Sequence, residues 1–196
     1  MDSLYDLLRF LHILGFAFMS VPLFNLIVVN ERVSLSKTFN YHADRYMENI
    51  IKHGAYRCFV FQTTVFITGV MLCITGPLGF ESIWSNWILA VKTVLLFILM
   101  ALLSYVHFHL QSRIELIFAE IKPDSQVPED LASLLKRYRV RRKWLATLCL
   151  FIVIATIVFG IQVYDPFKPA VTIGLLGLGV LFSWKANKTL LRFGWV

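Results

Sequence analysis

The sequence predicts an all-α protein, a polytopic bundle of about five transmembrane helices with the N-terminus outside and the C-terminus in the cytoplasm. Three observations support this. Hydrophobic residues make up 58% of the 196 residues and charged residues only 16%, whereas a soluble domain carries about 25% charged residues. The apolar residues form long stretches, and basic residues gather between alternate stretches. We therefore expect one domain, residues 1–196, in the lipid bilayer of the cell membrane (the inner or plasma membrane).

The five spans follow from the lengths of the apolar stretches. Roughly 20 apolar residues are needed to cross a hydrocarbon core of about 30 Å. Four stretches meet that length, at about residues 4–29, 58–76, 87–110 and 144–163, and a shorter fifth lies at about 170–184. The fifth span can extend through the amphipathic segment 185–191 if its lysines reach toward the membrane surface. We expect residues 111–143 to form a helical cytoplasmic loop, broken at Pro123 and resumed at Pro128.

The distribution of basic residues predicts the orientation of the chain in the membrane. Sixteen lie in the loop 30–57, the segment 111–143 and the tail after residue 184, whereas Arg9 and Lys168 fall on the other side and Lys92 lies just inside a span. Because basic residues stay cytoplasmic, the N-terminus is placed outside. We interpret the run Lys136–Arg142 as a topology signal that lies against anionic lipid. The run is short and next to the membrane, so we expect no nucleic-acid partner.

Ionisable side chains at membrane depth are costly, so each one is a functional candidate. The third span carries a polar stripe at helical spacing, from Lys92 through Ser104 to His107 and Gln111. We expect this stripe to face the bundle interior, with His109 pointing elsewhere. An alternative is that these groups only form hydrogen bonds between helices and carry no chemistry.

Depth along the helices separates the candidates into two layers. His12 and Lys92 enter from the outer side and are predicted neighbours, and His53 and His107 are predicted neighbours near the inner surface. His12 and His107 differ in depth by more than about 10 Å, so one metal ion shared by these two is not expected.

Each layer suggests its own chemistry. Two neutral imidazoles on different helices can bind the iron of a b-type haem, so His107 and His53 are the predicted cofactor and metal ligands, with His12 a further cofactor-binding candidate. Because histidine titrates near neutral pH, His12 and Lys92 are the predicted catalytic pair, moving protons from a substrate in the outer half of the bundle.

Several short motifs support a family resemblance. They are Leu11-His12-Ile13 in the first span, Met47-Glu48 before the second, and Lys92 with Tyr105-Val106-His107 in the third. With these motifs the chain resembles a superfamily of small membrane proteins that includes CopD-like copper-resistance domains, DUF2269 integral membrane proteins and HemJ-type protoporphyrinogen oxidases. The resemblance implies a haem-associated or redox role, with His12 and Lys92 as the functional pair.

Three functions are left open by the sequence. The first is a membrane redox protein that binds haem b and oxidises a quinol or a protoporphyrinogen-like substrate with proton transfer. The second is a copper or small-solute transport element of the CopD kind, in which Met19 and Met71 are the plausible sulfur pair. The third is a non-catalytic structural or assembly subunit, whose partner is a second copy of the chain or another subunit of a membrane complex.

Overall fold

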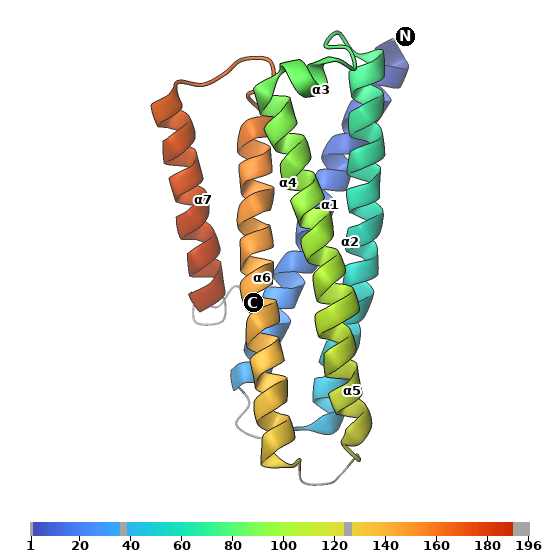
Figure 1. Cartoon of the computed structure of the whole chain (residues 1–196), viewed down its shortest axis with the longest axis vertical. Coiled ribbons are helices and arrows are strands. Elements are labelled where there is room, and N and C mark those ends of the chain that lie inside the picture. Colours follow the sequence, from blue (N-terminus) through green and yellow to red (C-terminus); the bar gives the residue numbers. More distant parts are fainter. Residues whose placement is uncertain (1, 36–38, 124–126, 190–196) are drawn as a thin grey trace.

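A computed structural model describes residues 2–35, 39–123 and 127–189 of the chain, and within these ranges every regular element is helical (Figure 1). Among these residues, five helices are long and apolar enough to cross a membrane, which confirms the predicted all-α class with five spans, while the orientation stays a prediction. The elements are α1 (Asp2–Leu35), α2 (Tyr41–Thr75), α3 (Ser82–Ser85), α4 (Trp87–Ser104), the π-helical segment η1 (Tyr105–Gln111), α5 (Ser112–Glu120), α6 (Glu129–Gly160) and α7 (Pro169–Thr189).

The helices are longer than the predicted spans. Residues 41–57, expected as part of a loop, form the first half of α2, which begins where the Asn40 side chain accepts a hydrogen bond from the Ala43 amide. An asparagine in this position satisfies one of the free amides of the first turn, so the helix starts well before the apolar stretch. α7 also continues past residue 184, as predicted, and the expected extension beyond Thr189 lies outside the described residues.

Proline and asparagine set the other boundaries. The third span runs without a break through η1 into α5, which ends at Glu120 before Pro123. Pro128 stands directly before α6, and Glu129 and Asp130 fill its first turn, where acidic groups are favoured. Both boundaries agree with the prediction for the segment 111–143. The Asn86 side chain caps α4 by accepting from the Ile88 and Leu89 amides.

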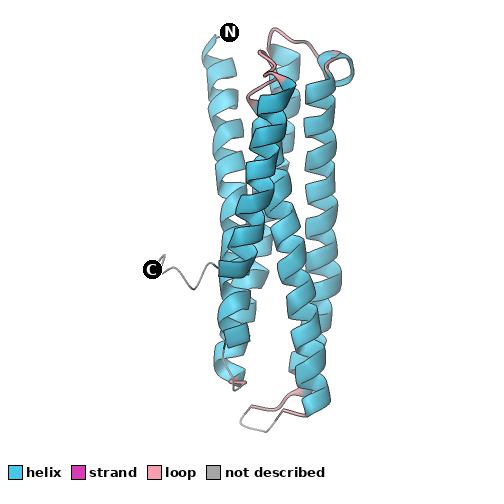
Figure 2. Cartoon of the chain, turned by 90° about the vertical axis from the view of Figure 1, so that its left-hand side faces the viewer, coloured by secondary structure: helices cyan, strands magenta, loops and turns pink. Residues whose placement is uncertain are grey.

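Four long helical segments pack around a shared interior, namely α1, α2, the continuous segment α4–η1–α5, and α6. The remaining long helix, α7, lies on the outside. α1 packs against α2, α6 contacts both α1 and α4, and α7 packs chiefly against α6. Figure 1 shows that α7 ends partway along the bundle, so the lower parts of α2, α5 and α6 project beyond it, and Figure 2 shows the bundle from the side that α7 covers. Large apolar side chains such as Phe10, Val60 and Ile173 are exposed on the outer surfaces. Such surfaces fit contact with lipid, where exposed apolar groups carry no penalty.

The bundle has two chemically different ends. We call the end that holds the start of α1, α3 and the α6–α7 connection the N-terminal end, and the opposite end the basic end (Figure 1). The basic end has its own apolar core of Ile114, Phe118 and Leu135, joined by partly buried Tyr41 and Tyr138. The bundle therefore continues beyond the apolar spans as a packed helical extension.

A tyrosine pair joins α1 to the α6–α7 connection at the N-terminal end. The hydroxyl oxygens of Tyr5 and Tyr164 lie 3.0 Å apart. The hydrogen bond with Tyr5, together with burial, raises the pKa of Tyr164 from 10.0 to about 12. Because the folded-state pKa exceeds the unfolded one, this contact stabilises the fold below pH 10 and is lost as the pH rises toward 12.

This raised pKa gives a first prediction. In an alkaline titration followed by tyrosinate absorbance, Tyr164→Phe is expected to remove one group that ionises near pH 12. The control Tyr46→Phe, at an exposed position, should leave that late step in place. Identical titration curves for the wild type and Tyr164→Phe in the late step would show that the pair is not formed.

Candidate functional site

The N-terminal half of the bundle contains the first of the two predicted layers. His12 of α1 points at α2, where its Nδ1 lies 3.0 Å from the Thr68 hydroxyl oxygen. The Thr68 hydroxyl itself donates to the Thr64 carbonyl at 2.6 Å. Because the Thr68 hydroxyl hydrogen is donated to Thr64, the Thr68 oxygen can only accept a hydrogen bond from His12. The proton of the neutral imidazole therefore sits on Nδ1. In a neutral ring, Nε2 then keeps its lone pair and can act as a base.

Two glycines make room for the functional groups of this layer. A Cβ at Gly69 would lie 3.2 Å from His12 Cε1, so the imidazole occupies space that a side chain on α2 would take. A Cβ at Gly160 would lie 3.5 Å from Lys92 Nζ, so the ammonium rests on bare backbone of α6. The layer therefore combines four helices: α1, α2, α4 and α6.

Lys92 is the unusual group of this layer. Its charge acts on both His12 and Cys73, which places all three in one neighbourhood. Among the described residues, no carboxylate pairs with the Lys92 ammonium and no acceptor lies within hydrogen-bond distance of it. An ammonium inside an apolar bundle without an anionic partner can attract a negative or developing negative charge. The structure thus brings His12 and Lys92 into one layer, as the depth argument expects.

The predicted stripe of the third span faces inward. Leu96, His107 and Gln111 are buried, and Lys92 and Ser104 are partly buried. His107 is 8% exposed whereas His109 is exposed and stacks on Tyr105, which confirms the predicted difference between the two. The His107 ring meets the rings of Tyr56 and Phe59 edge-on, with centroids 4.8 and 5.8 Å away.

His53 lies differently from the prediction that pairs it with His107. Its side chain is exposed, and its Nδ1 donates to the Asn49 carbonyl of its own helix at 2.7 Å. The aromatic neighbours of the His107 ring are Tyr56, Phe59 and Phe108, and His53 is not one of them. In the described ranges, no three His, Cys, Asp or Glu side chains come together to hold a metal ion. The ligand pair His53 and His107 stays a prediction.

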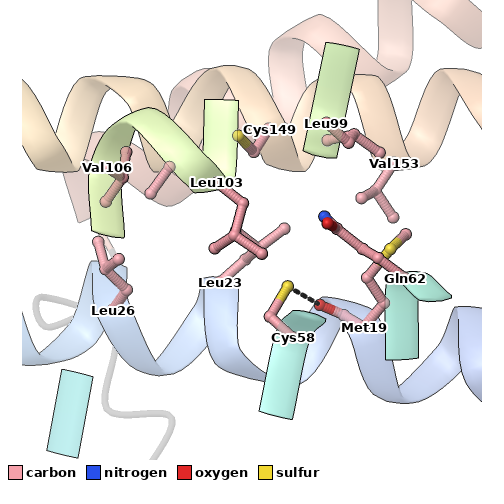
Figure 3. Close-up of a pocket in the computed structure, with 11 residues that line it drawn as sticks. Met19, Leu23, Leu26, Cys58, Gln62, Leu99, Leu103, Val106, Cys149 and Val153 are labelled. Carbon is pink, nitrogen blue, oxygen red and sulfur yellow. Dashed lines mark hydrogen bonds between the residues drawn. The ribbon is translucent and has the colours of Figure 1, made fainter. Parts of the chain in front are cut away.

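The volume of the cavities between the helices can be compared with the space that a haem needs. Two of the cavities between the described helices measure about 30 Å³ each, against about 300–1,000 Å³ for a typical ligand pocket. The first is walled by Met19, Cys58, Gln62 and Cys149 (Figure 3). Neither cavity has room for a macrocycle, so neither fits haem, and we derive no step through it.

The sulfur atoms do not support the predicted copper pair. Met19 is fully buried at 0% exposure, whereas Met71 is 42% exposed. The two side chains therefore differ in exposure, and the copper pair stays a prediction. The three cysteines are free and buried, as expected from their positions in the spans.

A buried ion cluster at the basic end of the described bundle is a feature that the sequence analysis did not predict. Glu48 of α2 accepts from Arg139 Nε at 2.9 Å and from Arg142 Nη1 at 2.5 Å. Arg139 also pairs with Asp44 at 2.8 Å, and Gln111 accepts from Arg142 at 2.7 Å. Glu48 and Arg142 are both 0% exposed. The prediction that the basic run lies against lipid is therefore wrong for Arg139 and Arg142.

A signal for this cluster was present in the sequence. Asp44 and Glu48 are four residues apart and Arg139 and Arg142 three apart, so each pair shares one helix face. Arg45 and Glu115 form a further ion pair at 2.7 Å on the edge of the cluster. Opposite charges on two such helix faces are expected to meet when the helices pack. Asp44 and Glu48 share a helix face only because α2 begins at Tyr41, before both of them.

Comparison with known proteins gives no relative: no protein-family model, curated protein sequence or solved structure matches this chain. The resemblance to the CopD, DUF2269 and HemJ group therefore stays a prediction from short motifs.

Proposed function

We propose that this chain is a multi-pass membrane oxidoreductase whose His12 and Lys92 take protons from an apolar substrate of the quinol or porphyrinogen class. The observation that supports this best is the Lys92 ammonium, which lies in the same layer as His12 and has no anionic partner among the described residues. We also infer the orientation given by the basic residues, with the His12 layer in the outer half of a cell membrane.

The two side chains have different tasks in this proposal. His12 Nε2 accepts a proton from the substrate hydroxyl or pyrrole N–H, while Thr68 holds Nδ1 and so fixes the ring. Lys92 stabilises the negative charge that grows on the substrate as that proton leaves. A quinol loses two protons and two electrons, and the electrons pass to a separate acceptor.

The test compares variants of Lys92 in proteoliposomes. Oxidation of a quinol and of a porphyrinogen is followed with ferricyanide as electron acceptor. Loss of a preorganised charge of this kind lowers turnover by about 10²–10³-fold, so we expect that loss for Lys92→Met. Lys168→Met, at an exposed position of the same end of the bundle, is the matched control and should keep wild-type turnover. Equal turnover in Lys92→Met and the wild type would reject the proposal.

A second function is favoured by the ion cluster. Its charges are buried and paired with one another, an arrangement that needs no substrate. The same chain is then a non-catalytic subunit of a membrane complex. Unchanged activity of the host complex in both His12→Asn and Lys92→Met would favour this function over the first.

A further inference from the structure

A cavity in the half of the bundle nearer the basic end brings together two donors that the proposed function does not use. It measures about 30 Å³, and Pro22 and Leu26 of α1, Lys52 of α2, and His107 and Gln111 of η1 line it. Because Lys52 and His107 line the same small cavity, one ligand bound there can contact both. Lys52 is partly exposed and His107 is buried, which makes Lys52 the outer member of the pair.

His107 has an unused hydrogen-bonding nitrogen. Its Nδ1 is buried and has no partner within the described part of the chain. A buried polar atom without a partner costs free energy, so such an atom beside a cavity indicates that something binds there. Tyr56 and Phe59 hold the ring in place from the side, and η1, a π-helical segment of the kind found at functional sites, carries it.

Lys52 is likewise not neutralised by the protein. Glu48 lies one turn earlier on α2, but both of its carboxylate oxygens are taken by Arg139 and Arg142. The described residues provide no other carboxylate ion pair for Lys52. An ammonium and an imidazole N–H that line one cavity call for an anionic group.

We propose that this cavity binds the phosphate of an anionic phospholipid, which accepts hydrogen bonds from Lys52 Nζ and His107 Nδ1. The cavity is too small for a whole head group, so only phosphate oxygens enter and the rest of the lipid stays outside. Its walls of Pro22 and Leu26 are apolar, and the neighbouring Tyr56 and Phe108 are 55% and 68% exposed, which gives the acyl chains a surface. Basic pockets between membrane helices bind anionic head groups in the same way.

The test measures lipid binding and not activity, so it is independent of the proposed function. Purified protein in detergent is titrated with phosphatidylglycerol or phosphatidylcholine, and bound lipid is counted by native mass spectrometry. We expect one phosphatidylglycerol to bind more tightly than phosphatidylcholine. Loss of one charge-assisted hydrogen bond in Lys52→Gln or His107→Asn should weaken it roughly tenfold. Lys136→Gln removes an exposed charge of the same end and should not change the affinity.

Three results would overturn the proposal. Equal binding of the two lipids, which carry the same phosphate, shows that the site does not select a lipid of net negative charge. An equal loss in Lys136→Gln shows unspecific attraction to the basic end. Full competition by inorganic phosphate alone shows a site for a free anion and not for a lipid. Thermal unfolding without added lipid is measured for each variant, and a weakened affinity in a variant with wild-type unfolding supports the site.

Discussion

Replacing Arg142 with methionine is expected to lower the free energy of unfolding by about 3–5 kcal/mol, the cost of leaving a buried charge without its partner. Arg142 is 0% exposed and donates to both Glu48 oxygens and to Gln111. Without it, the buried Glu48 keeps only Arg139 as a cationic partner. Reversible unfolding in mixed detergent micelles, followed by circular dichroism, measures the loss.

The neighbouring arginine provides the control for this prediction. Arg141 is exposed, and its guanidinium lies 5.5 Å from the centre of the Tyr105 ring. Arg141→Met should therefore cost less than about 1 kcal/mol, the value of an exposed cation–π contact. The double variant Glu48→Met with Arg142→Met should lose less than the sum of the two single variants, because the two groups interact directly. Equal, small losses at Arg141 and Arg142 would argue against a buried cluster.

Replacing His12 with asparagine is expected to slow oxidation of the quinol or porphyrinogen substrate by about 10²-fold or more, the contribution of a positioned general base. An asparagine side chain can still donate to the Thr68 hydroxyl, but it has no basic nitrogen to replace Nε2. The change removes little packing, so the free energy of unfolding should fall by no more than about 1 kcal/mol. Turnover in proteoliposomes and unfolding in micelles are measured on the same preparation.

Two further variants distinguish a base from a structural histidine. Thr68→Val removes the acceptor that orients the ring and should lower turnover less than His12→Asn does. His109→Asn changes an exposed histidine outside the proposed site and should have no effect. Wild-type turnover in His12→Asn would remove the residue from the mechanism, and a loss explained by unfolding would assign it a structural role.

The fold was predictable because apolar length and charge are read directly from the sequence. Five stretches of apolar residues and the breaks at Pro123 and Pro128 correspond to the observed helices. The start of α2 was not predictable in this way. Residues 41–57 are polar and look like a loop, and they are helical because they pack against α5 and α6 at the basic end. Tertiary packing of this kind cannot be seen in hydropathy.

The site could be predicted in part. The spacing from Lys92 to Gln111 places these residues on one interior face, and counting residues from the membrane surface places His12 with Lys92. Arg139 and Arg142 were misread, because a run of basic residues beside a membrane is normally solvated and its partners lie about 90 positions earlier in the chain. Pairing over such a distance depends on how the helices pack. Thr68 and the two glycines carry no signal of their own in a single sequence.

The π-helical segment η1 also sets the direction in which the side chains of α5 point around the helix axis. A π turn holds one residue more than an α turn, and each residue advances an α-helix by about 100°. Gln111, which ends the segment, accepts from Arg142, and Ile114, which follows it, packs in the core of the basic end. Shortening the segment by one residue would rotate everything after it by about a quarter of a circle. The ion cluster and the basic-end core therefore both depend on one insertion next to His107.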